Sequence, residues 1–111
     1  MASIIVSVDA YRSLAFGSIS GSYAAIGTPF AHPMRIVKII NTCNTDMSIS
    51  FDGTTDNDYI PAGSFSLYDL STNEVEQAGW FFRTGTQVYV KQISAPASGS
   101  VIVISLYGQG E

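Results

Sequence analysis

The sequence has 111 residues, which is the length of one domain, and no feature in it marks a second. Hydrophobic residues make up 46% of it and charged residues only 13%, against a usual charged share of about 25%. The net charge is −4 and the five Lys and Arg residues are scattered, which excludes the clustered cations that bind nucleic acid or an anionic membrane. Either Ser, Thr, Gly and Asn cover much of the surface, or part of the surface is apolar and buried against partner proteins.

Cysteine content and hydropathy restrict the environment of the protein. The single cysteine, Cys43, excludes an internal disulfide and a Cys-based zinc site, as expected for assembly in a reducing cytoplasm. Met1–Val8 has no basic n-region, so we expect no signal peptide there. No apolar stretch approaches the ~20 residues that span a membrane, so we expect no membrane association.

The first third of the chain, residues 1–33, follows no single period. After the strand-like Ser3–Val8, aromatic residues recur at irregular intervals between Gly and Ser. Two interpretations are open: these residues form extra strands of the same domain, or an extended arm that docks on a neighbouring protein. Large aromatics are enriched at interface centres, and the candidate interface residues are Tyr11, Phe16, Tyr23, Phe30 and, from later in the chain, Phe81.

The next segments alternate as strands do. Met34–Ile40 is rich in β-branched residues and apolar on both faces, which is typical of a strand that is covered on both sides. Asp46–Phe51 has apolar residues on one face and polar residues on the other, which predicts a half-buried antiparallel strand. Asp52-Gly53 then predicts a tight turn.

The rest of the chain reads as further strands and turns. A turn is predicted at Pro61–Gly63 and a loop at Ala95–Gly99. Ser71 followed by Glu74 forms a capping box, which predicts a helical turn over Thr72–Ala78. The predicted strands are Ser64–Leu70, Trp80–Arg83, Thr86–Ile93 and Ser100–Tyr107.

Short strands at even spacing predict an all-β fold, a small antiparallel β-sandwich of jelly-roll-like character. Residues 34–111 are expected to form its core, within a single domain overall. The side chains expected in the hydrophobic core, chosen by alternation, are Ile36, Ile49, Phe51, Val88, Val90, Ile102, Ile104 and Leu106.

Residues for catalysis are sparse. His32 is the only histidine, and no nucleophile-elbow or phosphate-loop pattern occurs, so we expect no enzyme and no cofactor. Cys43 is expected to be a buried or half-buried thiol, since a nucleophilic role would need a nearby base. Asp52–Asp58 contains three carboxylates that could bind calcium, but their spacing does not match an EF-hand and a solvated loop explains them as well.

Several motifs together resemble a known family. They are Arg35–Asn41, Ile49–Gly53, Tyr59–Gly63, Val88–Lys91, Gly99–Val101 and Tyr107-Gly108. In these motifs and in length, the chain resembles the capsid decoration (staple) proteins of short-tailed, epsilon15-like Salmonella phages. The resemblance implies a non-enzymatic, jelly-roll-like virion protein, made in the host cytoplasm, that binds the major capsid protein on the outer capsid surface. It also implies a homodimer across a symmetry axis and no catalytic residues.

Two other functions remain open on the sequence. One is a tail or head–tail connector component, which is structural as well but present at a single vertex. The other is a carbohydrate-binding β-sandwich module, which would use Trp80, Tyr59 or Tyr68 as a sugar platform.

Overall fold

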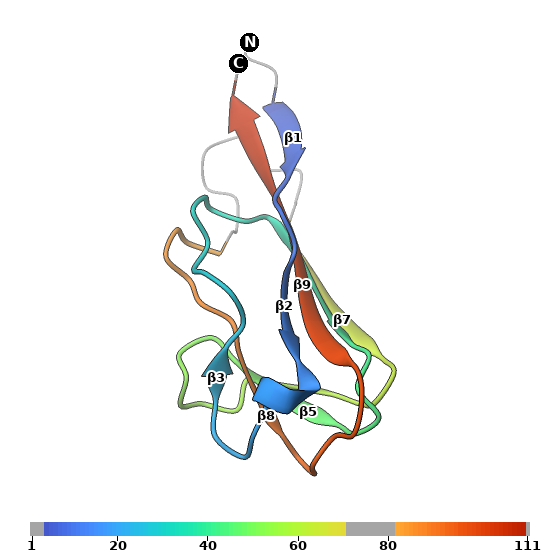
Figure 1. Cartoon of the computed structure of the whole chain (residues 1–111). Coiled ribbons are helices and arrows are strands. Elements are labelled where there is room, and N and C mark those ends of the chain that lie inside the picture. Colours follow the sequence, from blue (N-terminus) through green and yellow to red (C-terminus); the bar gives the residue numbers. More distant parts are fainter. Residues whose placement is uncertain (1–3, 71–81, 111) are drawn as a thin grey trace.

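The computed structural model describes residues 4–70 and 82–110, which form two antiparallel sheets packed face to face (Figure 1). The strands of sheet A are β1 (Ile4–Val8), β2 (Arg12–Ala15), β4 (Ile36–Asn41), β7 (Phe65–Asp69) and β9 (Ser100–Gly110). Those of sheet B are β3 (Ala24–Ala25), β5 (Met47–Ser50), β6 (Asp58–Ile60) and β8 (Tyr89–Gln92). A short 3-10 turn, η1 (Phe16–Ser18), follows β2. The predicted all-β sandwich is confirmed.

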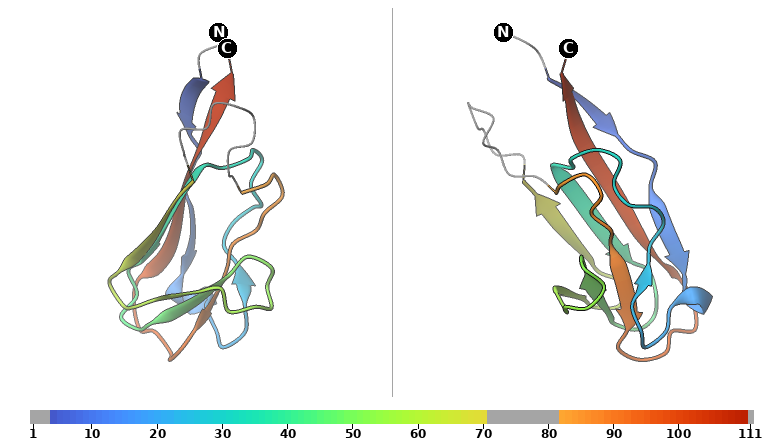
Figure 2. Two further views of the ribbon diagram at one scale, coloured as in Figure 1. Left: turned by 180° about the vertical axis from the view of Figure 1, so that it is seen from behind. Right: turned by 90° about the vertical axis from the view of Figure 1, so that its left-hand side faces the viewer.

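The strand order is that of a jelly roll. β1 and β2 both pair with β9, so they act as one interrupted edge strand, and sheet A then runs β1/β2-β9-β4-β7 beside sheet B with β3-β8-β5-β6. The chain is wound like a long two-stranded ribbon, in which β1/β2 pairs with β9, β3 with β8, β4 with β7, and β5 with β6. Folding this ribbon over itself brings its halves together as the two layers seen in Figure 2.

The core lies between the inner faces of the two sheets. On β5, Met47 and Ile49 are fully buried, which confirms the predicted inward face of that strand. The expectation of a half-buried strand is wrong, because Ser48 and Ser50 on its other face are buried as well. Val88 and Val90 are also buried as predicted. The remaining buried apolar side chains come from both sheets and from the segments between them: Ile19, Ile26, Phe30, Met34, Val37, Ile39, Cys43, Ile60, Val101 and Val103.

The predicted inward face of β9 is wrong, and so is that of β4. Val101 and Val103 are fully buried, whereas Ile102, Ile104 and Leu106 are only partly buried and point to the other side of sheet A. On β4, Val37 and Ile39 take the place expected for Ile36. Because both faces of these strands are apolar, alternation alone cannot say which face meets the core, and a shift of one residue exchanges the two.

The N-terminal third belongs to the sandwich, so of the two interpretations the extra strands are observed and the extended arm is not. β1 and β2 extend along β9, and β3 pairs with β8 in the opposite sheet. Ile19, Ile26 and Phe30 are at most 6% exposed in the core. The segment looked irregular because it crosses from one sheet to the other, with long connections between short strands. The helical turn predicted at Thr72–Ala78 lies outside the described residues, as do Trp80 and Phe81.

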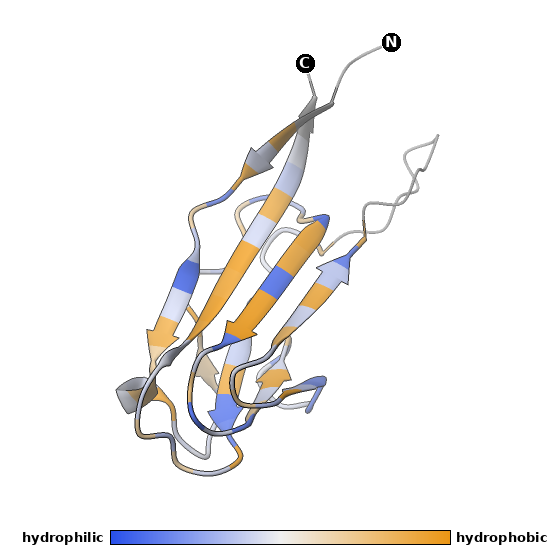
Figure 3. Ribbon diagram, turned by 90° about the vertical axis from the view of Figure 1, so that its right-hand side faces the viewer, coloured by the Kyte–Doolittle hydropathy of each residue, from blue (hydrophilic) through white to orange (hydrophobic). Residues whose placement is uncertain are grey.

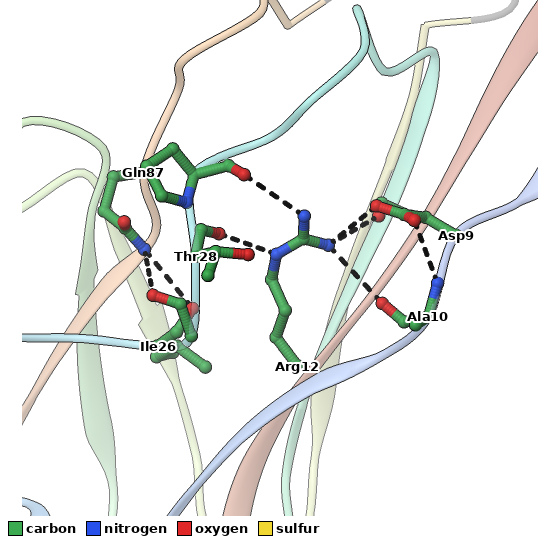
Figure 4. Close-up of polar contacts among 9 residues, drawn as sticks. Asp9, Ala10, Arg12, Ile26, Thr28 and Gln87 are labelled. Atoms are coloured by element: carbon green, nitrogen blue, oxygen red, sulfur yellow. Dashed lines mark hydrogen bonds and ion pairs between the residues drawn. The ribbon is translucent and has the colours of Figure 1, made fainter.

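Arg12 holds this crossing segment against sheet A (Figure 4). Its side chain is 9% exposed and points from β2 toward the interior. Nε donates to the carbonyl of Thr28 at 2.7 Å, Nη2 donates to that of Pro29 at 3.3 Å, and Nη1 lies 3.1 Å from the Asp9 carboxylate. The guanidinium carbon lies 5.1 Å from the centre of the Phe30 ring. A planar cation with several donors can satisfy all of these partners at once, which a lysine cannot.

Replacing Arg12 with alanine should lower the free energy of unfolding by about 2–4 kcal/mol, because the carbonyls of Thr28 and Pro29, the Asp9 carboxylate and the Phe30 ring all lose their contact with the largely buried guanidinium. Arg12→Lys should recover only part of that loss, since the fork of donors is missing. The measurement is urea unfolding followed by circular dichroism. Arg83→Ala, at an exposed position in a turn, is the control and should change stability by about 0.5 kcal/mol or less. Equal losses in the two alanine variants would contradict this role of Arg12.

Candidate interaction surface

The outer face of sheet A carries an aliphatic surface. On β4, the side chains of Ile36, Lys38 and Ile40 point outward, away from the core. Each pairs in register with outward residues of its two neighbouring strands, so the side chains form rows across the sheet. The rows are Phe65–Ile40–Ile102–Ser13, then Leu67–Lys38–Ile104, then Asp69–Ile36–Leu106–Val8, with Val6 beyond them beside Gly108. We call these outward residues the aliphatic face; β9, β4 and β7 run through it in Figure 3.

Within the described residues, no further layer of helices or strands packs on this face. The described chain contains only the two sheets and the short η1, and sheet B packs on the opposite side of sheet A. The apolar side chains at its margins are therefore largely exposed: Val6 65%, Val8 67%, Phe65 56% and Leu67 55%. With strands about 4.8 Å apart and residues about 3.3 Å apart along them, the rows cover on the order of 400 Å² in projection. A largely apolar surface of that size, interrupted by Ser13, Lys38 and Asp69, is often functional in a monomeric protein.

The outer face of sheet B has the opposite character. Ser48 of β5 lies between Tyr59 of β6 and Lys91 of β8, and its hydroxyl is 2.7 Å from the Tyr23 hydroxyl. Lys91 Nζ lies 3.1 Å from the Asp56 carboxylate and 4.8 Å from the centre of the Tyr23 ring. Ser48 is itself buried, whereas the Asp56 side chain is 63% exposed and Tyr59 is 52% exposed, so polar groups of this face meet water. Sheet B thus follows the usual rule that outward residues of a sandwich are polar, and sheet A departs from it.

The structure does not gather the predicted interface aromatics on one surface. Tyr11 is 68% exposed between β1 and β2, and Phe16 is 40% exposed at the start of η1. Tyr23 is engaged in the polar outer face of sheet B, where its hydroxyl donates to Asp56. Phe30 is 2% exposed in the core, which corrects the expectation that it anchors a partner. Phe81 lies outside the described residues.

The residues considered for a sugar platform are separated as well. Tyr68 points inward from β7, and its ring packs edge-on against Phe51 and Phe82 at 5.6 and 5.7 Å between ring centres. Burial, with the bond to the Asp58 carboxylate, holds the pKa of Tyr68 well above its usual range. Tyr59 is 52% exposed on sheet B and donates to Asp46. Trp80 lies outside the described residues.

The remaining candidates for chemistry have structural partners. The His32 ring stacks on Tyr107, with ring centres 3.9 Å apart and planes 8° apart. Cys43 is 2% exposed, and burial raises the pKa of its thiol, which keeps the thiol protonated. Asp52 accepts hydrogen bonds from the backbone N–H groups of Thr55 and Thr54, and these hold its pKa well below the usual range.

The carboxylates of Asp52–Asp58 do not converge on one point. Asp52 is enclosed by its own turn, Asp56 faces Lys91 and Tyr23, and Asp58 accepts from Tyr68. Within residues 4–70 and 82–110, no group of three or more His, Cys, Asp or Glu side chains is placed to hold a metal ion. Of the two interpretations of this segment, the structure therefore favours the plain loop over a calcium site.

Sequence reasoning missed the aliphatic face, although its signal is present. Met34–Ile40 was expected to be covered on both sides because both of its faces are apolar. Val101–Ile104 shows the same two-sided pattern. In the structure only one side of each strand meets the core. A strand that is apolar on both faces, in a sandwich of only two layers, is therefore the signal that indicates this surface.

The fold and this surface define the protein as a jelly-roll β-sandwich with one polar and one aliphatic outer face. Comparisons of the chain with protein-family models, with curated proteins and with solved structures found no match. In the part of the chain that the structure describes, no helix is long and apolar enough to cross a membrane.

Proposed function

We propose that the protein is a non-enzymatic virion component that binds the outside of an icosahedral capsid and staples neighbouring capsid subunits, stabilising the shell. The observation that carries this proposal is the aliphatic face. An isolated sandwich would leave three isoleucines of its two central strands, Ile40, Ile102 and Ile104, partly exposed to water without benefit. A protein that works on the surface of another protein gains from that exposure, because each apolar side chain covered there contributes to binding.

The resemblance to the capsid decoration proteins supplies the identity of the partner in this proposal, the major capsid protein. The jelly-roll strand order agrees with that resemblance, and so does the low charge content of 13%. The net charge of −4 argues against nucleic acid as the partner. Synthesis in the host cytoplasm, a place on the outer virion surface and pairing of two copies across a symmetry axis belong to the same proposal.

A charged substitution on the aliphatic face should separate binding from folding. Leu67 is 55% exposed on the edge strand β7, so Leu67→Glu should leave the isolated protein folded. On a capsid the same carboxylate would be taken out of water beside Lys38, its neighbour in register on β4, and it would replace an apolar contact. We therefore expect the affinity to fall at least about tenfold. The measurement is cosedimentation with capsid shells of an epsilon15-like phage that lack this protein, together with the heat resistance of the loaded shells.

Ile93→Glu is the matched control, because Ile93 is 51% exposed and follows β8 in the other sheet. It should bind as the wild type does. Wild-type protein that fails to bind or protect shells would refute the proposed function. Equal binding by wild type and Leu67→Glu would show that shells are bound through another surface.

A further inference from the structure

One charge lies in the middle of the aliphatic face. Lys38 is the central residue of β4, and its neighbours in register are Leu67 on β7 and Ile104 on β9. Its ammonium nitrogen lies 4.5 Å from the centre of the Phe65 ring. Lys38 forms no ion pair with any residue in the described ranges 4–70 and 82–110. In the free protein the ammonium group lies over the face of that ring and stays hydrated on its open side, while its methylene stem lies along apolar neighbours.

Covering the face would remove that hydration. An ammonium group enclosed among Leu67, Ile104 and Phe65 is costly unless an anionic group meets it. The occupant of the face must therefore supply apolar side chains around the margin and a carboxylate at the centre. This requirement discriminates between possible occupants.

A second copy of the chain does not meet the requirement. If two copies packed face to face about a two-fold axis through the middle of the face, the two Lys38 ammonium groups would approach each other out of water. The other charge on the face, Asp69, lies at the end of β7 on the opposite edge from β1. A two-fold axis that placed Lys38 of one copy opposite Asp69 of the other would lie toward the β7 edge of the face. Most of β9 would then remain uncovered.

We infer that the aliphatic face binds a different protein, through an apolar surface that presents a carboxylate to Lys38. This inference rests on the proposed function, in which that protein is the capsid subunit, and it identifies the docking face and the charge that orients it. Lys38 then selects the position of the staple on the shell, because any displacement leaves the ammonium group among apolar side chains. The pairing of two copies has to use another surface.

The test is the binding of full-length variants to the same unloaded capsid shells. Lys38→Glu places like charges together and should weaken binding at least about tenfold, and Lys38→Gln should give an intermediate loss. Lys38→Arg keeps the charge and should bind within about threefold of the wild type. Arg83→Glu makes the same change of charge in the exposed turn beside Phe30 and should have no effect.

Sedimentation and unfolding of the isolated proteins complete the test. We expect Lys38→Glu to have the same oligomeric state and unfolding midpoint as the wild type. If Lys38→Glu and Lys38→Gln bind shells like the wild type, the inference is wrong while the proposed function stands. If the wild type is a dimer that Lys38→Glu dissociates, the protein that occupies the aliphatic face is a second copy of the chain. If Lys38→Glu lowers the unfolding midpoint, a segment of the chain itself covers the face. Wild-type protein that binds no shells refutes the proposed function and the occupant with it.

Discussion

Gly99→Ala should destabilise the folded protein by roughly 3–5 kcal/mol, the largest effect that we expect from any single substitution considered. Gly99 precedes β9 and has a φ of +95°, a conformation that L residues with a side chain rarely adopt. A Cβ atom there would lie 2.3 Å from the carbonyl oxygen of Thr42 and 2.6 Å from Cα of Cys43. Both contacts are with backbone, so no side-chain rotation can relieve them.

Hydrogen bonds keep the two backbones at this distance. The Thr42 N–H and the Thr42 hydroxyl both donate to the Ser100 carbonyl at 2.9 Å, and the Ser100 N–H donates to that hydroxyl at 2.9 Å. The Phe16 N–H donates to the Gly99 carbonyl at 3.0 Å. Any shift that made room for a methyl group would break several of these bonds at the point where β9 begins.

Gly85→Ala is a closely matched control for the steric part of this effect. Gly85 has a φ of +93°, but no atom lies within 4 Å of the position of its Cβ. Its alanine variant should lose only the conformational part, about 1–2 kcal/mol. Urea unfolding of both variants gives the comparison. If the two lost the same stability, the close approach of Thr42 would not be what requires glycine at position 99.

Asn41→Ala should cost about 3–4 kcal/mol of stability, because one fully buried side chain satisfies four backbone groups. Its amide nitrogen shares its two N–H groups among the carbonyls of Thr45, Ile60 and Pro61, at 3.0, 3.1 and 3.3 Å. Its amide oxygen accepts from the Cys43 N–H at 2.9 Å. Asn41 ends β4 in sheet A, whereas Ile60 ends β6 in sheet B, so the amide joins the two layers at one end of the sandwich.

Two further variants test this explanation. Asn44→Ala removes an exposed amide whose oxygen accepts one bond, from the Ala97 N–H, and should cost about 1 kcal/mol or less. Asn41→Asp would bring a carboxylate against three carbonyl oxygens, which favours its protonated form and raises its pKa. Relative to the wild type, the Asp variant should therefore be most stable below about pH 4 and lose stability as the pH rises toward 7. If the stability lost in Asn41→Asp did not depend on pH, the proposed hydrogen-bond pattern would be contradicted.

Local pattern determined the class of the fold. The alternation over Asp46–Phe51 predicted both the strand and its buried face, and the glycines at 53 and 63 have the positive φ values that the predicted turns require. These features depend on residues that are adjacent in the sequence. The absence of clustered cations was equally visible there. A small antiparallel β-sandwich follows from such features without any long-range contact.

Only the tertiary structure decided which faces are buried and where the N-terminal third lies. Ile102 and Val103 are both β-branched and apolar, and only pairing with β4 and packing on sheet B place Val103 inside and Ile102 outside. β1 finds its partner at the other end of the chain, a pairing that no local period encodes. The same long-range pairing assembles the aliphatic face and sets Lys38 at its centre. Alternation indicates which residues share a face. Which face another layer covers is determined by contacts between residues that are distant in the sequence.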